Sequence, residues 1–235
     1  ITEKMLRYFI RKVHNGHHWV KPQVVISVSA GVTMVERRAV ISSAERAGAR
    51  KVFLVDQPTA SAIGAGLPIT EPQGCMVVDI GGGTTEVAVL SMGGLVQVEC
   101  LRLAGDDFDA AIIRHLKDVH NLHIGARTAE NIKVNIGSAA PMEQEFSMEV
   151  SGREMVVGLP KKVIVGSDEV RAAIQEPLSK ITDAIRKTLE NTPPEISADL
   201  VETGIHLCGG GALLRGIDKV ISEQTGLKVT VAEDP

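Results

Sequence analysis

A glycine-rich turn between two apolar runs is the first candidate for chemistry in this sequence. The turn consists of Gly81, Gly82, Gly83 and Thr84. Residues without a Cβ atom let backbone N–H groups approach an anion closely, and the Thr84 hydroxyl adds another donor. Asp79, at the end of the preceding apolar run, could hold a hydrated Mg2+, because Mg2+ binds one or two carboxylates and keeps its waters. The pattern favours a phosphate-binding hairpin over a plain glycine-rich hairpin.

A β-branched run follows this turn directly at 85–90. A dinucleotide-binding fingerprint or a P-loop would instead lead from its glycines into a helix, and a P-loop would also need Gly-Lys-Ser/Thr. The sequence therefore predicts a strand, a glycine turn and a second strand.

A second glycine cluster follows an apolar run at 205–208. It consists of Gly209, Gly210, Gly211 and Ala212. Helical spacing at Leu214, Ile217 and Ile221 comes next. Backbone N–H groups before a helix can meet an anion, and glycines let a flat ring lie against the backbone. The cluster lacks the glycine spacing of a dinucleotide-binding fingerprint. An anion and a flat ring therefore both stay open as its ligand.

Composition limits the classes of protein that remain. The chain has 235 residues, a net charge of -4 and 3% aromatic residues. This charge gives no basic field for nucleic acid, so we expect no nucleic-acid partner. No apolar run approaches the roughly 20 residues that a membrane span needs. The first residues have helical spacing without a starting methionine, so we expect a fragment.

The elements before these residues must help to position them, and the first 70 residues alternate between strand and helix, which predicts a layered α/β fold. Thr33-Met34-Val35-Glu36 is typical of a capping box, with Gly48 ending its helix. A proline-containing stretch, 67–74, predicts a boundary between a first lobe at 1–72 and a second at 73–235. The second lobe is expected to carry a small inserted subdomain at about 109–166.

Four further expectations concern helices of the second lobe. Ser167 is predicted to cap a long helix, which Pro177 should kink or divide. Asp106 and Asp109 are interpreted as partners of a helix dipole rather than as metal ligands. His115, His120 and His123, in or near one helix, are expected on a solvated face.

Four motifs taken together carry a family resemblance. They are residues 77–89, residues 127–133, Thr192-Pro193-Pro194-Glu195, and residues 209–216. They resemble the actin-type ATPase superfamily, which also contains the 70-kilodalton heat-shock chaperones and sugar kinases, and more closely the MreB family of bacterial actins. The resemblance extends through essentially the whole chain. It implies an actin-like ATPase fold, with two ribonuclease H-like lobes and an ATP cleft between them.

The resemblance also implies roles for individual residues. Gly81 to Thr84 would hold the β- and γ-phosphates, and Asp79 would orient Mg2+ through water. Glu130 and Lys133 would flank the ribose and adenine, while Gly209 to Ala212 would lie against the adenosine.

Hydrolysis would depend on residues that hold a water in line with the γ-phosphate. Gln57 and Thr84 match the family positions that do this. The family usually has Glu-Glu-Pro where this chain has Asp56-Gln57-Pro58. Glutamine can position water but is not a base. An upstream phosphate hairpin that the family carries is absent from these residues.

The function implied is that of a weak ATPase which assembles into filaments. The protein would be cytoplasmic and peripheral to the inner face of the bacterial membrane, where it organises cell-wall synthesis and maintains rod shape. Its partners would be itself, anionic lipid, and membrane proteins of cell-wall synthesis and rod shape. Trp19 and Val20 match a membrane-contacting loop, although a core role for Trp19 stays open. A sugar or acetate kinase and a nucleotide-binding scaffold without hydrolysis are the alternatives.

Overall fold

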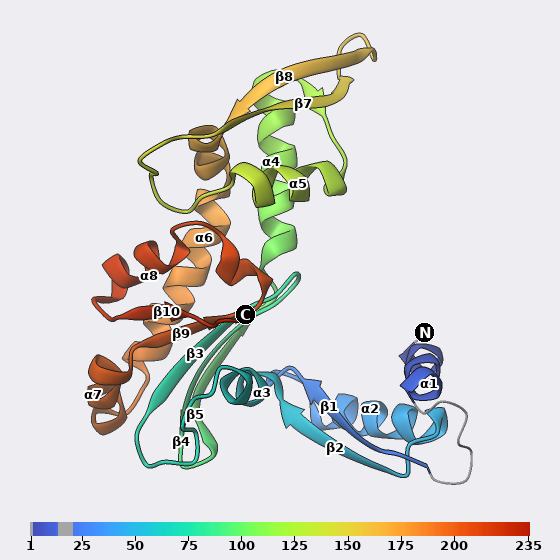
Figure 1. Cartoon of the computed structure of the whole chain (residues 1–235), viewed down its shortest axis with the longest axis vertical. Helices are drawn as coiled ribbons and strands as arrows, with labels where there is room; N and C mark the ends of the chain where they lie inside the picture. The colour runs from blue at the N-terminus through green and yellow to red at the C-terminus, as the bar shows by residue number, and fades with distance from the viewer. Residues whose placement is uncertain (1, 14–20) are drawn as a thin grey trace. The chain divides into compact units, whose positions relative to one another are not determined.

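The computed structural model describes residues 2–13 and 21–235 of the chain (Figure 1). It divides into two compact units, Ile1–Ala60 and Ser61–Pro235. The first unit ends inside a helix, ahead of the proline-containing stretch. The lobes expected at 1–72 and 73–235, and the insert at about 109–166, stay predictions.

The first unit is built around two parallel strands joined through a helix. Its elements are α1 (Thr2–Val13), β1 (Gln23–Val28), α2 (Met34–Ala47), β2 (Lys51–Asp56) and the beginning of α3 (Gln57–Gly64). β1 and β2 pair in parallel from Gln23↔Lys51 onward. The predicted capping box is confirmed, because the Thr33 hydroxyl and the Glu36 carboxylate each accept the other's backbone N–H. Gly48 ends α2 in the left-handed conformation, as predicted.

The second unit contains two sheets and the longer helices. Its elements after α3 are β3 (Cys75–Ile80), β4 (Thr85–Ser91), β5 (Gly94–Leu101), α4 (Gly105–His120), β6 (Leu122–His123), α5 (Ala126–Ile136), β7 (Ser147–Glu154), β8 (Pro160–Gly166), α6 (Ser167–Glu190), α7 (Pro194–Thr203), β9 (Ile205–Cys208), the 3-10 helix η1 (Gly210–Leu213), α8 (Ile217–Thr225) and β10 (Val229–Val231). One sheet has the order β10-β9-β3-β4-β5 and the other β6-β7-β8. The predicted strand–glycine turn–strand is the β3–β4 hairpin.

The central strand β3 sets the geometry of the large sheet. Every residue of β3 is buried, and the strand pairs with β9 in parallel and with β4 in antiparallel orientation. β5 is antiparallel to β4 and so runs in the same direction as β3. The carboxyl ends of β3, β5 and β9 therefore meet at one edge. This edge is where both glycine clusters leave the sheet.

A continuous apolar core supports this edge. It contains Val78 and Ile80 from β3 and Phe108 from α4, and α6 packs against β4, β5 and α4. Aliphatic side chains fill most of this core, with Phe108 its largest buried member. Among the described residues, no helix is both long and apolar enough to cross a bilayer.

The structure corrects two expectations about α6, its division at Pro177 and its capping by Ser167. The helix continues from Ser167 to Glu190 with Pro177 inside it, so the proline does not divide it. Pro177 and its neighbour Leu178 are buried, although proline cannot donate the backbone hydrogen bond of a helix interior. Ser167 is not the capping residue either. Gly166 occupies that position, and the Ser167 hydroxyl has other partners.

Candidate nucleotide-binding site

The β3–β4 turn is fastened to the beginning of α4. The Gly81 N–H donates to the Thr84 carbonyl at 2.9 Å and closes the turn. The Gly105 and Asp106 N–H groups then donate to the carbonyls of Gly81 and Gly82, at 3.1 and 2.7 Å. The turn and the positive end of the α4 dipole therefore share one surface, which suits an anionic ligand.

The second glycine cluster packs against the end of β3. A Cβ atom on Gly211 would lie 2.3 Å from Ile80 Cγ2, and one on Gly209 would lie 2.4 Å from the Ile80 carbonyl oxygen. Gly209 also has a φ of +79°, which disfavours other residues. A Cβ atom on Gly210 would meet nothing within 4 Å. Two of these glycines are therefore required by packing, whereas Gly210 presents open backbone.

A cavity of about 470 Å³ lies where these segments meet. The predicted site residues that line it are Gly81, Gly82, Glu130, Lys133, Gly210 and Gly211. They come from the β3–β4 turn, from α5 and from η1, segments that are up to 130 residues apart in the sequence. A volume in this range suits a small organic ligand.

The cavity also contains residues that the sequence interpretation missed. They include Gly105, Asp106, Phe108, Leu213 and Arg215. The meeting of β3, β5 and β9 at one edge is the signal that could have found Gly105 and Asp106, because β5 leads directly to them. Asp106 had been interpreted only as a partner of the helix dipole. Its side chain lies in the first turn of α4 and also faces the cavity.

Lys133 is held in place from α4. Its ammonium nitrogen lies 2.9 Å from Asp109 Oδ1 and donates to the Gly105 carbonyl at 2.9 Å. Burial raises the pKa of the Asp109 carboxyl, and the hydrogen bond from Lys133 opposes this rise. Asp109 therefore acts as an internal partner of Lys133, which the helix-dipole interpretation did not foresee.

Asp79 lies at the same edge but does not line the cavity. Its side chain is buried, and Oδ2 accepts a hydrogen bond of 2.6 Å from the Ser61 hydroxyl. Together with burial, its charge raises the pKa of the neighbouring Cys208 thiol to about 11. A single carboxylate near a phosphate-binding turn is a donor set that fits a largely hydrated Mg2+.

Other predicted site residues lie outside the cavity lining. Gly83 is exposed and Thr84 is half-buried in the turn, whereas Gly209 packs against Ile80 and Ala212 is buried. Gln57 is the first residue of α3 and belongs to the first unit, as does Asp56, which receives an ion pair from Arg37. Trp19 and Val20 lie outside the described residues.

Of the three histidines expected on a solvated face, His123 is exposed, whereas His115 and His120 of α4 are only partly exposed. His115 and His120 have side chains 24% exposed, and both contact Glu169 Oε1 on α6, at 2.9 and 2.5 Å. The sequence interpretation missed this contact because Glu169 is about 50 residues away in the chain.

The fold, with a cavity of about 470 Å³ at the carboxyl edge of a mixed sheet, is that of an actin-like protein. The family model described as MreB/Mbl protein matches residues 1–235. The chain belongs to the MreB/Mbl family.

Curated relatives agree with this assignment. The chain is 50% identical over 236 residues to the cell shape-determining protein MreB of Escherichia coli (strain K12). This match covers 100% of this chain and 68% of the relative. It is 43% identical over 235 residues to the cell shape-determining protein Mbl of Bacillus subtilis (strain 168), which covers 100% of this chain and 71% of that relative.

Solved structures give the same fold. The crystal structure of MreB5 of Spiroplasma citri bound to AMPPNP superposes with a TM-score of 0.94 at 38% identity, over 98% of this chain and 69% of that one. The ADP-bound crystal structure of the same protein gives a TM-score of 0.95. The MamK double helical filament gives 0.83 at 21% identity over 99% of this chain and 70% of that one, which shows the shared fold alone. The actin-like fold expected from the sequence is thereby confirmed.

Proposed function

We propose that this protein binds ATP with Mg2+ in the cavity of the second unit and assembles into actin-like filaments. The main observation in support of this proposal is that the β3–β4 turn, α5 and η1 converge on one cavity of about 470 Å³. The relative MreB5 of Spiroplasma citri, with 38% identity, was crystallised with AMPPNP and with ADP. This supports a nucleotide as the ligand of the corresponding cavity.

Each wall of the cavity has a distinct task in this proposal. Backbone N–H groups of the Gly81–Thr84 turn bind the β- and γ-phosphates, next to the positive end of α4. Glu130 and Lys133 from α5 contact the ribose and base, and the open backbone at Gly210 lets the adenosine lie close. Mg2+, when bound, neutralises phosphate charge, and Asp79 holds its water shell. By the sequence resemblance, Gln57 and Thr84 match the positions that orient the water for a slow hydrolysis.

The cellular role that follows is that of a shape-determining cytoskeletal filament. Filaments would lie at the inner face of the bacterial membrane, contact it through Trp19 and Val20, and organise the proteins of cell-wall synthesis and rod shape. Curated relatives named cell shape-determining protein support the shape role. The membrane and cell-wall partners rest on the sequence resemblance.

The substitution Asp79→Ala tests the metal and phosphate assignment. Loss of the carboxylate should abolish Mg2+-dependent ATP turnover, because the phosphate charge then lacks a positioned metal. Phosphate release is measured beside electron microscopy of the protein with and without ATP. Turnover equal to that of the unmodified protein would refute the assignment, and absence of filaments under all conditions would refute the cytoskeletal role.

A nucleotide-binding scaffold without hydrolysis is the second candidate, and Gln57 favours it. Its amide orients a water but cannot accept the proton. Filaments that form with ATP while phosphate release stays at background would support the scaffold.

A further inference from the structure

Arg215 links two walls of the cavity. Its side chain lines the cavity, and Nη1 donates to the carbonyls of Val134 at 3.1 Å and Gly137 at 3.2 Å. These carbonyls lie at the carboxyl end of α5, where a cation is favoured by the helix dipole. Because Arg215 is hydrogen-bonded to the end of α5, the positions of Arg215 and of α5 depend on each other. The helix α5 forms the cavity wall that carries Glu130 and Lys133, the predicted ribose and base contacts.

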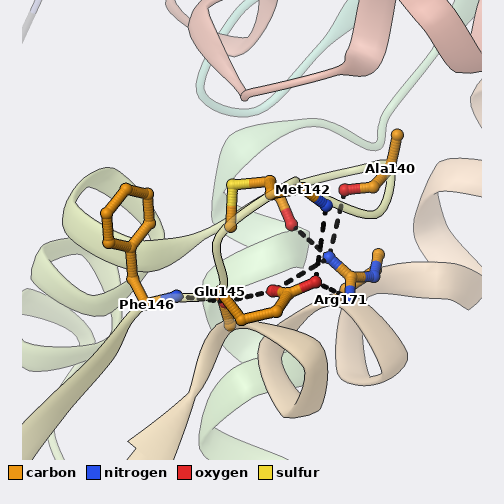
Figure 2. Close-up of polar contacts among 7 residues, drawn as sticks. Ala140, Met142, Glu145, Phe146 and Arg171 are labelled. Atoms are coloured by element: carbon orange, nitrogen blue, oxygen red, sulfur yellow. Dashed lines mark hydrogen bonds and ion pairs between the residues drawn. The ribbon is translucent and has the colours of Figure 1, made fainter.

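The segment that follows α5 is fixed by Arg171 of α6 (Figure 2). Arg171 Nη1 donates to the Ser138 hydroxyl at 2.8 Å and to the Ala140 carbonyl at 3.0 Å. Its Nη2 donates to Glu145 Oε1 at 2.6 Å. One guanidinium group, with a side chain only 17% exposed, thus holds both ends of residues 138–145.

Glu145 has a second partner that fixes its orientation. The Ser167 hydroxyl donates to Glu145 Oε2 and accepts the Phe146 N–H at 2.9 Å. This is the hydroxyl that the sequence had assigned to helix capping. The hydrogen bonds from Arg171 and Ser167 lower the pKa of Glu145 to about 2. The carboxylate is therefore ionised at neutral pH, and the contact with Arg171 is charge-assisted.

Residues 138–146, the segment held by Arg171 and Ser167, contact Arg215 at two places and the next residue, Gly216, at a third. The Arg215 guanidinium carbon lies 5.7 Å from the centre of the Phe146 ring, within the range of a cation–π interaction. The Arg215 carbonyl accepts the Ala139 N–H at 2.7 Å. A Cβ atom on the next residue, Gly216, would lie 2.9 Å from Ala140 Cβ, so the segment packs closely there. Movement of the segment would thus displace Arg215.

We propose that Arg171 and Glu145 are positioning residues for the nucleotide cavity, which they do not themselves line. By holding residues 138–146 they fix Arg215 against α5, and this sets the affinity for the nucleoside part of the ligand. The inference rests on the proposed ATP-binding function. It states that the Arg171–Glu145 ion pair, between α6 and the segment before β7, influences the affinity for the nucleotide.

The variants Glu145→Gln and Arg171→Met test this inference. Glu145→Gln keeps the shape of the side chain and removes its charge. Glu149→Gln is the matched control, because Glu149 forms an ion pair of 2.7 Å with Lys162 on the exposed β7–β8 hairpin. Affinities are measured for MgATP and for inorganic tripolyphosphate, both in competition with a fluorescent ATP analogue.

We expect MgATP affinity to fall about three- to tenfold in both test variants, the size typical of coupled neighbours. Tripolyphosphate affinity should stay unchanged, because that ligand needs only the glycine turn. The control should match the unmodified protein for both ligands. Unchanged MgATP affinity in the test variants overturns the inference. An equal loss for both ligands with a lowered melting temperature also overturns it, since that describes a merely structural pair.

Hydrogen exchange separates this inference from the proposed function. Amides of residues 138–140 and 142–146 and of Arg215 should exchange faster in Glu145→Gln than in Glu149→Gln, with no nucleotide present. An unmodified protein that binds neither ligand refutes the proposed function. Unchanged exchange in Glu145→Gln refutes the clamp, whatever the nucleotide binding.

Discussion

The ammonium nitrogen of Lys133 lies 2.9 Å from a carboxylate oxygen of Asp109, and both side chains are largely buried, 18% and 11% exposed. This ion pair joins α5 to α4 beside the cavity. The two side chains differ in burial. Asp109 is the less exposed of the two, and burial raises the pKa of its carboxyl group. Lys133 therefore serves the fold as well as the proposed ligand.

Lys133→Met should destabilise the protein more than Asp109→Asn does. Removing the lysine leaves a buried carboxylate without its cation, which costs about 3 kcal/mol. Removing the carboxylate charge leaves a lysine that still donates to the Gly105 carbonyl, at a cost of about 1 kcal/mol. Urea unfolding at pH 7 measures both free energies. Equal losses would contradict the unequal burial of the pair.

The same comparison has a predicted pH dependence. A carboxyl group whose folded pKa is raised destabilises the fold above that pKa, and the penalty disappears as the pH falls toward the unfolded pKa of 3.8. Without Lys133, the opposing effect on the pKa of Asp109 is lost. The stability deficit of Lys133→Met should therefore be largest at neutral pH and shrink on acidification, while that of Asp109→Asn should not.

Two neighbouring glycines should respond differently to alanine. In Gly211→Ala the new Cβ would meet Ile80 Cγ2 at 2.3 Å, so the free energy of unfolding should fall by about 1–3 kcal/mol. In Gly210→Ala the new Cβ meets nothing within 4 Å, so stability should be retained. If the adenosine lies against this backbone, Gly210→Ala should nevertheless weaken ATP binding. Calorimetry and thermal unfolding of both variants give the comparison, and full ATP affinity in Gly210→Ala would count against this placement.

Local patterns in the sequence were sufficient for much of the fold. The β3–β4 hairpin and the α2 capping box were predicted because their signals lie within a few residues. The division expected at Pro177 does not occur, and the burial of Pro177 inside α6 depends on elements far away in the sequence. The partners of His115 and Ser167 were missed for the same reason, since Glu169 and Glu145 reach them only through tertiary packing.

The residues of the candidate site also fall into those that local sequence patterns predict and those that only tertiary contacts reveal. Glycine types and spacing pointed to Gly81, Gly82 and Gly210 before any fold was known. The parallel directions of β3 and β9 then explain why these residues share an edge. Arg215 belongs to the motif at 209–216, but neither it nor Gly105 has a local pattern that predicts a place at the cavity, because that place follows from strand direction and from contacts with α5.

Gln57→Ala should slow hydrolysis while it leaves ATP binding nearly intact. A residue that orients the attacking water acts mainly in the transition state, so kcat should fall and affinity should not. Gln57→Glu is the informative companion, because a carboxylate can also accept the proton and should restore or raise the rate. Single-turnover phosphate release and nucleotide affinity are measured together. Equal losses in rate and affinity would make Gln57 a structural residue.

Trp19 and Val20 lie outside the described residues, and the prediction for them rests on the sequence. They are adjacent bulky apolar residues in a stretch next to Lys21 and Pro22, in a chain with one tryptophan. Tryptophan suits the membrane interface, because its ring is apolar and its N–H can stay hydrated. One copy would bind weakly, since two side chains bury little area, but a filament that repeats the pair would bind by avidity.

Changing Trp19 to Ser and Val20 to Asp should therefore release filaments from anionic liposomes without stopping assembly. Co-sedimentation with liposomes and electron microscopy are performed on the same samples. Val201→Asp is the matched control, because Val201 is an exposed apolar residue on α7, 70% accessible. It should leave liposome binding unchanged, which separates a local contact from a general loss of apolar surface. A double variant that still co-sediments, or one that unfolds, would favour a core role for Trp19, because a membrane-contacting pair is dispensable for folding but not for lipid binding.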